Sequence, residues 1–193
     1  RRHGFTQLYV ALGSRDRAIR DFFGTGERLG VELHYVEEEQ PLGTAGSVKH
    51  CLDLLGREDF LVMSGGCVCD LDLKRAVQAH RQADAVATLV LCRRPDPPEY
   101  GLVVADEAGR VERFVDKPDW SQVGTSLVNT GICVLAPRAL EALPERECPD
   151  LRRDLFPALL GRGEKLHSIP LEGCWRDLQD CGAYLECVCD ALG

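Results

Sequence analysis

Four segments of this sequence combine carboxylates, an amine and glycines in spacings that could bind a phosphorylated ligand. The first reads E-E-E-Q-P-L-G-T-A-G over residues 37–46 and leads into an expected helix. Its small residues let backbone amides approach a ligand closely, and the start of a helix favours anions. By itself this pattern is more often an ordinary helix start, so its meaning depends on the other three segments.

The second segment, F-L-V-M-S-G-G over residues 60–66, predicts a short apolar strand that ends in a turn. Ligands of open α/β sheets gather at the carboxyl ends of strands, so a site is expected just after it. D-L-D follows at residues 70–72 and has two interpretations. It could be the D-x-D metal motif of glycosyltransferases, or a helix start in which Asp72 caps a helix beginning at Leu73. We favour the cap.

The third segment combines E-Y-G at residues 99–101, R-F-V-D-K-P at residues 113–118 and V-N-T-G-I at residues 128–132. A carboxylate accepts two hydrogen bonds from hydroxyl groups, and an ammonium group is a point charge for a phosphate. These residue types therefore suit a sugar phosphate. Taken alone, Lys117 would be interpreted as a solvated turn residue before Pro118.

The fourth segment, G-C-W-R-D-L at residues 173–178, adds another carboxylate. In this order the segments resemble the sugar-1-phosphate nucleotidyltransferase family, and most of all its bacterial mannose-1-phosphate guanylyltransferases. The family patterns are L-G-T-A-G, N-G-D, Y-G-x-V, F-x-E-K-P, N-T-G-I and G-Y-W-x-D-I-G, and D-L-F-P-A-L-L at residues 154–160 fits a further one. The resemblance implies transfer of a nucleotidyl group from a nucleoside triphosphate to a sugar 1-phosphate, with release of pyrophosphate.

The resemblance also assigns binding roles to individual residues. The edge of the nucleobase is assigned to Leu42, Gly43, Thr44 and Ala45. The sugar is assigned to Gly101, Asp116 and Asn129, with Asp116 standing where the family has a longer Glu.

The chemical step depends, by the same resemblance, on Lys117 and Asp177. Lys117 would reach the sugar 1-phosphate, and Asp177 would bind Mg²⁺. The second Mg²⁺ ligand of the family is the Asp of N-G-D, but this sequence has Gly66 there, and glycine has no oxygen ligand to offer from a side chain. The G-G-x-G-T-R-L triphosphate loop of the family is also missing from these 193 residues. We therefore expect this chain to be close to inactive.

Two explanations account for these departures. The chain could be a truncated piece of a longer enzyme, which its abrupt start at Arg1 near the second strand of the family favours. It could instead be a paralogue kept for binding a sugar nucleotide or for regulation, which Gly66 favours. A D-x-D glycosyltransferase is a third alternative, and it leaves the third segment unexplained.

The elements that must position these residues alternate between strands and helices, as in an α/β fold. The expected strands are 7–12, 31–36, 60–63, 85–92, 102–105, 110–115, 126–135 and 166–170. The expected helices are 16–23, 44–55, 73–82, 137–142, 150–160 and 180–192. They predict one three-layer α/β/α Rossmann-like domain with a mixed sheet, lacking the first strand and loop of the family. Residues 1–92 would form its nucleotide side and residues 93–193 its sugar side, with strand 60–63 buried at the centre of the sheet.

Composition narrows the function classes. The formal charge of −8 disfavours nucleic acid as a partner. No apolar run approaches a membrane span and no secretory signal is present, so a cytoplasmic location is expected. Ten cysteines without a C-x-x-C pattern predict reduced structural thiols, with a zinc or redox site as the weaker alternative. The nucleobase, the sugar, a homo-oligomer and a fusion to further domains all stay open.

Overall fold

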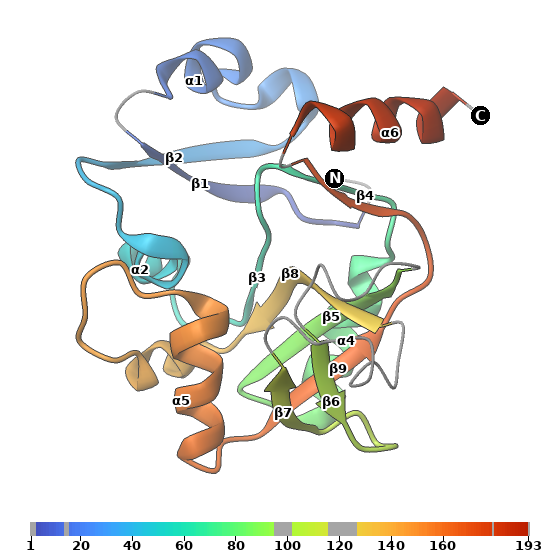
Figure 1. Ribbon diagram of the computed structural model, residues 1–193. Coiled ribbons are helices and arrows are strands. Elements are labelled where there is room, and N and C mark those ends of the chain that lie inside the picture. Colours follow the sequence, from blue (N-terminus) through green and yellow to red (C-terminus); the bar gives the residue numbers. More distant parts are fainter. Residues whose placement is uncertain (1–2, 14–15, 95–101, 116–126, 179, 193) are drawn as a thin grey trace. The chain divides into compact units, whose positions relative to one another are not determined.

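The computed structural model describes residues 3–13, 16–94, 102–115, 127–178 and 180–192 (Figure 1). The chain has the expected α/β class with a mixed central sheet. It divides into two compact units, each made of two stretches of sequence. The first unit is Arg1–Phe60 with Ala136–Arg162, and the second unit is Leu61–Leu135 with Gly163–Gly193. These units do not coincide with the expected nucleotide and sugar sides, which stay a prediction.

The first unit is built on two parallel strands, β1 (Gln7–Gly13) and β2 (Glu32–Glu38), paired from Gln7↔Glu32 to Gly13↔Glu38. Its helices are α1 (Arg17–Phe23), α2 (Gly43–His50), α3 (Leu52–Leu55), α5 (Phe156–Gly161), the 3-10 helices η1 (Glu27–Leu29) and η3 (Pro137–Ala142), and the π-helix η4 (Leu151–Leu155). The single helix expected over residues 44–55 is therefore interrupted at Cys51, whose N–H is shared between the carbonyls of Ser47 and Val48.

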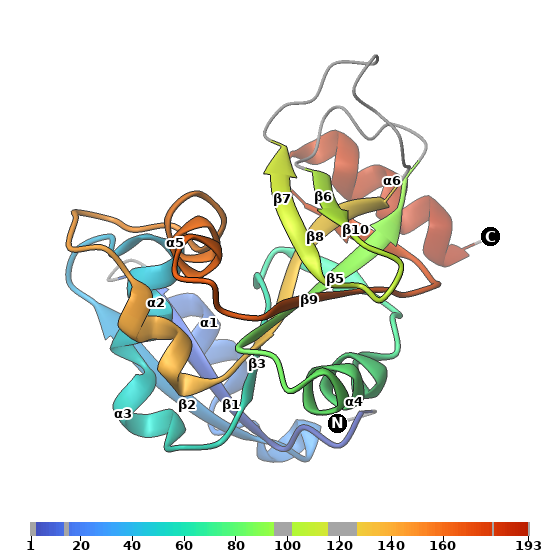
Figure 2. The same cartoon turned by 90° about the horizontal axis from the view of Figure 1, so that it is seen from below.

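The second unit contains a six-stranded sheet in the order β7-β6-β8-β5-β9, with β3 paired to β8. Its strands are β3 (Phe60–Val62), β5 (Ala87–Arg93), β6 (Leu102–Ala105), β7 (Val111–Val115), β8 (Leu127–Leu135) and β9 (Leu166–Pro170). The sheet is mixed because β5 runs antiparallel to β8 and parallel to β9. Helix α4 (Leu73–Ala83) packs on these three strands (Figure 2). A separate ladder joins β4 (Cys67–Cys69) to β10 (Trp175–Asp177), and helix α6 (Cys181–Leu192) follows.

Strand β5 forms the centre of the core. Its residues from Ala87 to Cys92 are all buried, since neighbouring strands flank both edges and a helix covers one face. A continuous apolar run of this kind is typical of a strand buried on both faces.

The expectation for strand 60–63 was wrong in its position. Phe60, Leu61 and Val62 are only half-buried, and 40% of the Met63 surface is exposed. Within the described residues β3 pairs with β8 alone, off the main path of the sheet. An apolar run shows that a strand is at least partly buried, but it does not show how many neighbours the strand has. Among the described residues, no helix has the length and apolar character to cross a membrane.

The burial of β5 makes a stability prediction. We expect Leu89→Ala to lower the free energy of unfolding by about 2–5 kcal/mol, because Leu89 is fully buried and truncation leaves a cavity. Leu54→Ala on helix α3 is the matched control, since 53% of its surface is exposed, and it should change stability by about 0.5 kcal/mol or less. Urea denaturation measures both, and similar values for the two variants would contradict the assigned core.

Candidate active site

The ladder of β4 and β10 positions Asp177. Its register pairs Cys67 with Asp177 and Cys69 with Trp175. Beyond its end, the Asp70 amide donates to the Cys174 carbonyl at 3.1 Å, and the Cys174 amide donates to Asp70 Oδ1 at 2.6 Å. The sequence pattern does not reveal this pairing, because three-residue strands are too short to show a period.

Gly66 lies beside the residue that follows Asp177. The Leu178 amide donates to the Gly66 carbonyl at 2.8 Å. A Cβ added to Gly66 would lie 3.8 Å from Ser64 Oγ and 3.9 Å from the Leu178 carbonyl oxygen, which is ordinary contact. The position thus has room for a side chain next to the strand end that carries Asp177.

Asp177 is the carboxylate of the predicted Mg²⁺ site that the structure describes here, and Mg²⁺ binding stays a prediction. Mg²⁺ prefers octahedral oxygen ligands, of which proteins commonly supply one or two carboxylates. In the part of the chain that the structure describes, no group of three or more His, Cys, Asp or Glu side chains has a metal-binding arrangement. With Gly66 in place of the family carboxylate, Asp177 is the one predicted metal ligand that the sequence retains.

Both aspartates of D-L-D have structural hydrogen bonds. Asp72 Oδ1 accepts from the Lys74 amide at 3.2 Å and caps helix α4, as expected. Asp70 binds the Cys174 amide and so holds the start of β10. This confirms the cap interpretation and accounts for Asp70 without a metal.

Asn129 lies in an irregularity of β8. The register with β5 passes from Cys133↔Leu89 to Asn129↔Leu91, so three residues of β8 lie opposite Val90 alone. The Thr130 hydroxyl donates to the Val90 carbonyl at 2.8 Å, and the Gly131 amide donates to Asn129 Oδ1 at 3.0 Å. Gly131 has φ +75°, a conformation that glycine adopts readily, and an added Cβ would meet nothing within 4 Å. The N-T-G-I motif therefore forms a β-bulge, in which the Gly131 amide fixes the orientation of the Asn129 side chain.

The chain segment that leads to Asp177 passes the same end of β5. The Leu171 amide donates to the Leu91 carbonyl at 2.9 Å, and the Cys92 thiol lies 3.7 Å from the Gly173 carbonyl oxygen. Since Leu91 is also the ladder partner of Asn129, two predicted site segments meet at the carboxyl end of β5. Ligands of α/β sheets gather at such ends.

In the first unit, the L-G-T-A segment is fixed by contacts with residues 148–150. Gly43 has φ +74°, and an added Cβ would lie 2.5–2.6 Å from backbone atoms of Cys148 and Pro149. The buried Ala45 donates its amide to the Pro149 carbonyl at 3.0 Å. The Leu42 amide makes a long contact, 3.4 Å, with Glu38 Oε2.

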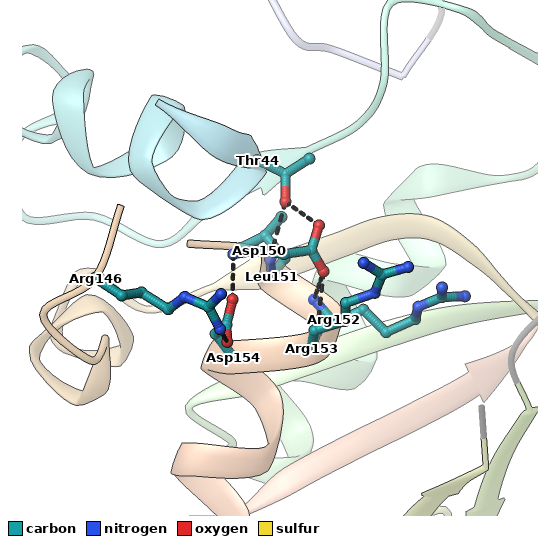
Figure 3. Close-up of polar contacts among 7 residues, drawn as sticks. All are labelled: Thr44, Arg146, Asp150, Leu151, Arg152, Arg153 and Asp154. Atoms are coloured by element: carbon teal, nitrogen blue, oxygen red, sulfur yellow. Dashed lines mark hydrogen bonds and ion pairs between the residues drawn. The ribbon is translucent and has the colours of Figure 1, made fainter. Parts of the chain in front are cut away.

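The Thr44 hydroxyl completes this attachment (Figure 3). It donates to Asp150 Oδ2 at 2.7 Å and accepts from the Leu151 amide at 2.9 Å. Asp150 Oδ1 accepts from the amides of Arg152 and Arg153, both at 2.9 Å, and so caps η4. The Thr44 side chain therefore positions its loop, and the predicted nucleobase contacts of Leu42, Gly43, Thr44 and Ala45 stay predictions.

The charged pair of Asp154 and Arg146 holds the backbone of Asp150 in place. Asp154 Oδ2 accepts from the Asp150 amide at 2.7 Å, and Asp154 Oδ1 pairs with Arg146 Nη1 at 2.6 Å. Burial by itself would raise the pKa of Asp150, but hydrogen bonds from the Arg153 amide, Thr44 and the Arg152 amide hold it below its ordinary value. The sequence showed D-x-F-P-x-L-L here but did not show that Asp150 binds Thr44.

Three predicted site residues, Gly101, Asp116 and Lys117, lie outside the described residues. Of the others, Asn129 and Asp177 belong to the second unit, and Gly43, Thr44 and Ala45 to the first. These residues belong to two different units, and their convergence on one cleft stays a prediction.

Comparisons with known proteins agree with these motifs. Residues 1–192 match the model of the nucleotidyl transferase family. The chain is 33% identical over 176 residues to the mannose-1-phosphate guanylyltransferase of Mycobacterium tuberculosis, covering 91% of this chain and 48% of that protein. It is 30% identical over 201 residues to a UTP–glucose-1-phosphate uridylyltransferase of Synechocystis, covering 97% of this chain and 52% of that protein. The chain thus spans about half the length of these relatives.

Solved structures share the fold. HddC from Yersinia pseudotuberculosis superposes with a TM-score of 0.83 at 20% identity, over 100% of this chain and 81% of that one. A UTP-bound UGPase from Acinetobacter baumannii gives 0.77 at 19% identity, over 98% and 78% of the two chains.

The lowered pKa of Asp150 predicts that its contribution to the stability of the fold depends on pH. A carboxylate whose pKa is lowered on folding stabilises the fold fully above its unfolded pKa of about 3.9 and loses that contribution as the pH falls through the lower folded value. We expect the difference in unfolding free energy between the wild type and Asp150→Asn to shrink between about pH 5 and pH 2. Asp53→Asn, at an exposed site on α3, is the control. A difference that does not change with pH would contradict the hydrogen-bonded carboxylate.

Proposed function

Because the chain belongs to the nucleotidyl transferase family, we propose that it forms part of the catalytic domain of an enzyme that transfers a nucleotidyl group from a nucleoside triphosphate to a sugar 1-phosphate. The observation that carries this proposal is the meeting of two motif segments at the carboxyl end of β5. There the bulge of Asn129 and the segment leading to Asp177 both contact Leu91 or Cys92. The activity of the whole protein is part of the proposal, since the chain covers about half of its relatives.

Asn129 is suited to bind a sugar. The Gly131 amide binds its Oδ1 and so holds the side-chain amide in one orientation, which presents the Nδ2 group as a donor for a hydroxyl oxygen. Lys117 would supply the phosphate-binding charge and Asp116 a hydroxyl acceptor. Those two roles rest on the sequence motif.

We propose mannose 1-phosphate and a guanine nucleotide as the substrates. Relatives named mannose-1-phosphate guanylyltransferase cover 91–96% of this chain at 30–33% identity and support this choice. A relative named for UTP and glucose 1-phosphate supports the alternative pair at 30% identity. Substrate tests should therefore include both pairs.

We further propose that this chain by itself binds a sugar phosphate without catalysing transfer. Nucleotidyl transfer depends on positioning and on neutralising phosphate charge. Here Gly66 removes one of the two carboxylates that the family uses for Mg²⁺, and a site with fewer carboxylates holds a hard cation weakly. This favours, as the second candidate function, a non-catalytic sugar-nucleotide-binding role. The structural hydrogen bonds of Asp70 and Asp72 argue against a D-x-D glycosyltransferase. A cytoplasmic location, a homo-oligomer and a fusion to further domains stay predictions from the sequence.

The first test concerns sugar-phosphate binding. We expect calorimetry to detect mannose 1-phosphate but not free mannose, and Asn129→Asp to weaken this binding about tenfold. This substitution keeps the oxygen that accepts from the Gly131 amide and replaces the Nδ2 donor by an anion. Gln78→Ala, at an exposed position on α4, is the control and should bind as the wild type does. Absence of binding for both mannose and glucose 1-phosphates would refute the proposal.

The second test concerns Gly66. Gly66→Asp should raise the affinity for Mn²⁺, used as a spectroscopic probe of a Mg²⁺ site, by at least about tenfold, because it restores a second carboxylate. Gly65→Asp is the matched control, since an added Cβ there meets nothing within 4 Å and the substitution introduces the same charge one residue away. Adding Asp177→Asn to Gly66→Asp should reverse the gain. An equal gain for both glycine variants would show that added negative charge alone is responsible.

A further inference from the structure

The chain contains two Cys-x-Cys pairs that lie in different secondary structures. Cys67 and Cys69 belong to strand β4, whereas Cys187 and Cys189 belong to helix α6. Residues two apart on a strand point to the same face, because the side-chain period is two. On a helix they are rotated by about 200° from each other and do not face each other. The same spacing therefore brings only the first pair together.

The face of β4 that carries these thiols also carries two residues of β10. Cys67 lies opposite Asp177 and Cys69 lies opposite Trp175 in the antiparallel ladder, and opposite residues share a face. The two thiols are close enough for each to shift the pKa of the other, so that the pKa of Cys67 is raised and that of Cys69 is lowered. Both are half-buried, and the buried Trp175 lies against Cys67.

We propose that Cys67 and Cys69 are a reversible modification site, at which exchange with a small-molecule disulfide such as oxidised glutathione forms a disulfide within β4. A metal site is less well supported, because no third His, Cys, Asp or Glu completes a metal-binding group among the described residues. A disulfide needs no third ligand, but the strand must bend to bring the two Cβ atoms within about 4.5 Å.

The exchange balances in two steps. The Cys69 thiolate attacks one sulfur of the oxidised reagent, forms a mixed disulfide and releases one reduced thiolate. The Cys67 sulfur then loses its proton to solvent, attacks the Cys69 sulfur and releases the second thiolate. The protein gives up two electrons and two protons, and the reagent takes them up as two thiols.

Cys69 suits the attacking role. Its contact with Cys67 lowers the pKa of the Cys69 thiol to about 7, although burial acts in the opposite direction. The thiolate is the nucleophile in exchange, so a lowered pKa provides more of the reactive form near neutral pH.

The disulfide should be easily reduced and should distort its strand. Residues two apart on a strand have Cα atoms roughly 6.4–6.8 Å apart, which is the upper end of the range that a disulfide accepts. Closing the bond pulls Cys67 toward Cys69 and shortens one side of the ladder with β10. Strained disulfides have more oxidising potentials, so mild thiol reductants should reverse the modification. If the proposed function holds, oxidation also displaces Asp177, the ladder partner of Cys67.

The test uses the full chain, first reduced and then equilibrated with mixtures of reduced and oxidised glutathione. After alkylation, trypsin releases residues 58–74, which contain Cys67 and Cys69 and no other cysteine. Oxidation should remove both alkylation sites from this peptide together and lower its mass by two hydrogen atoms. Residues 177–193, which carry Cys181 as well as Cys187 and Cys189, should remain alkylated at all three. Dithiothreitol should restore the reduced peptide.

Variants separate this disulfide from other products. Cys67→Ser should leave a stable glutathione adduct on Cys69, because no second thiol resolves it. With Trp120→Phe, Trp175 is the only tryptophan, and its fluorescence should fall on oxidation and stay constant in Cys67→Ser. These readouts do not depend on transferase activity. Persistent adducts on the wild type, a bond from either thiol to another cysteine, or equal oxidation of Cys187 and Cys189 would overturn the proposal.

Discussion

The short ladder between β4 and β10 is the constraint that positions the candidate site residue Asp177 in the second unit. It joins residues more than 100 positions apart in the chain and holds Asp177 opposite Cys67. Asp70 locks its end by exchanging two hydrogen bonds with Cys174. Next to the ladder, the Leu178 amide donates a hydrogen bond to the Gly66 carbonyl. This backbone contact places Gly66, where the family has a carboxylate, close to Asp177. Any change that shortens or breaks this ladder should therefore move Asp177.

A comparable long-range attachment organises the first unit. Thr44 and Asp150 are also more than 100 residues apart, and their hydrogen bond joins the start of α2 to the start of η4. Gly43 permits this approach because a side chain there would collide with the backbone of Cys148. The conformation of the L-G-T-A loop thus depends on a segment that a local motif does not contain. In both units the residues that resemble a ligand site are held by partners outside their own motif.

Gly66 departs from the family pattern at a position where the fold has no steric need for glycine. The position accepts glycine without strain and has space for a larger side chain, so stability gives no reason for the absence of a carboxylate. The fold therefore does not depend on a carboxylate at this position. Function in this family depends on the site that the fold carries, and not on the fold alone.

Much of this protein could be predicted from local pattern. Most strands and helices were placed within a few residues, although β4 and β10 were not expected. The mixed α/β class was confirmed, and Asp72 capped α4 as its position indicated. Such features depend on neighbours along the chain, which a sequence displays. The sequence also showed which chemical groups were present, including the loss at Gly66.

The tertiary structure alone decided features that depend on partners distant in sequence. The edge position of β3 and the Thr44–Asp150 bond leave no period or motif in the sequence, and the N-T-G-I motif does not by itself show that its backbone forms a bulge. The two Cys-x-Cys pairs make the same point, since their letters are alike and only the strand brings its thiols together. The sequence shows how many residues separate two side chains, but the secondary structure and the strand pairing determine whether those side chains face each other.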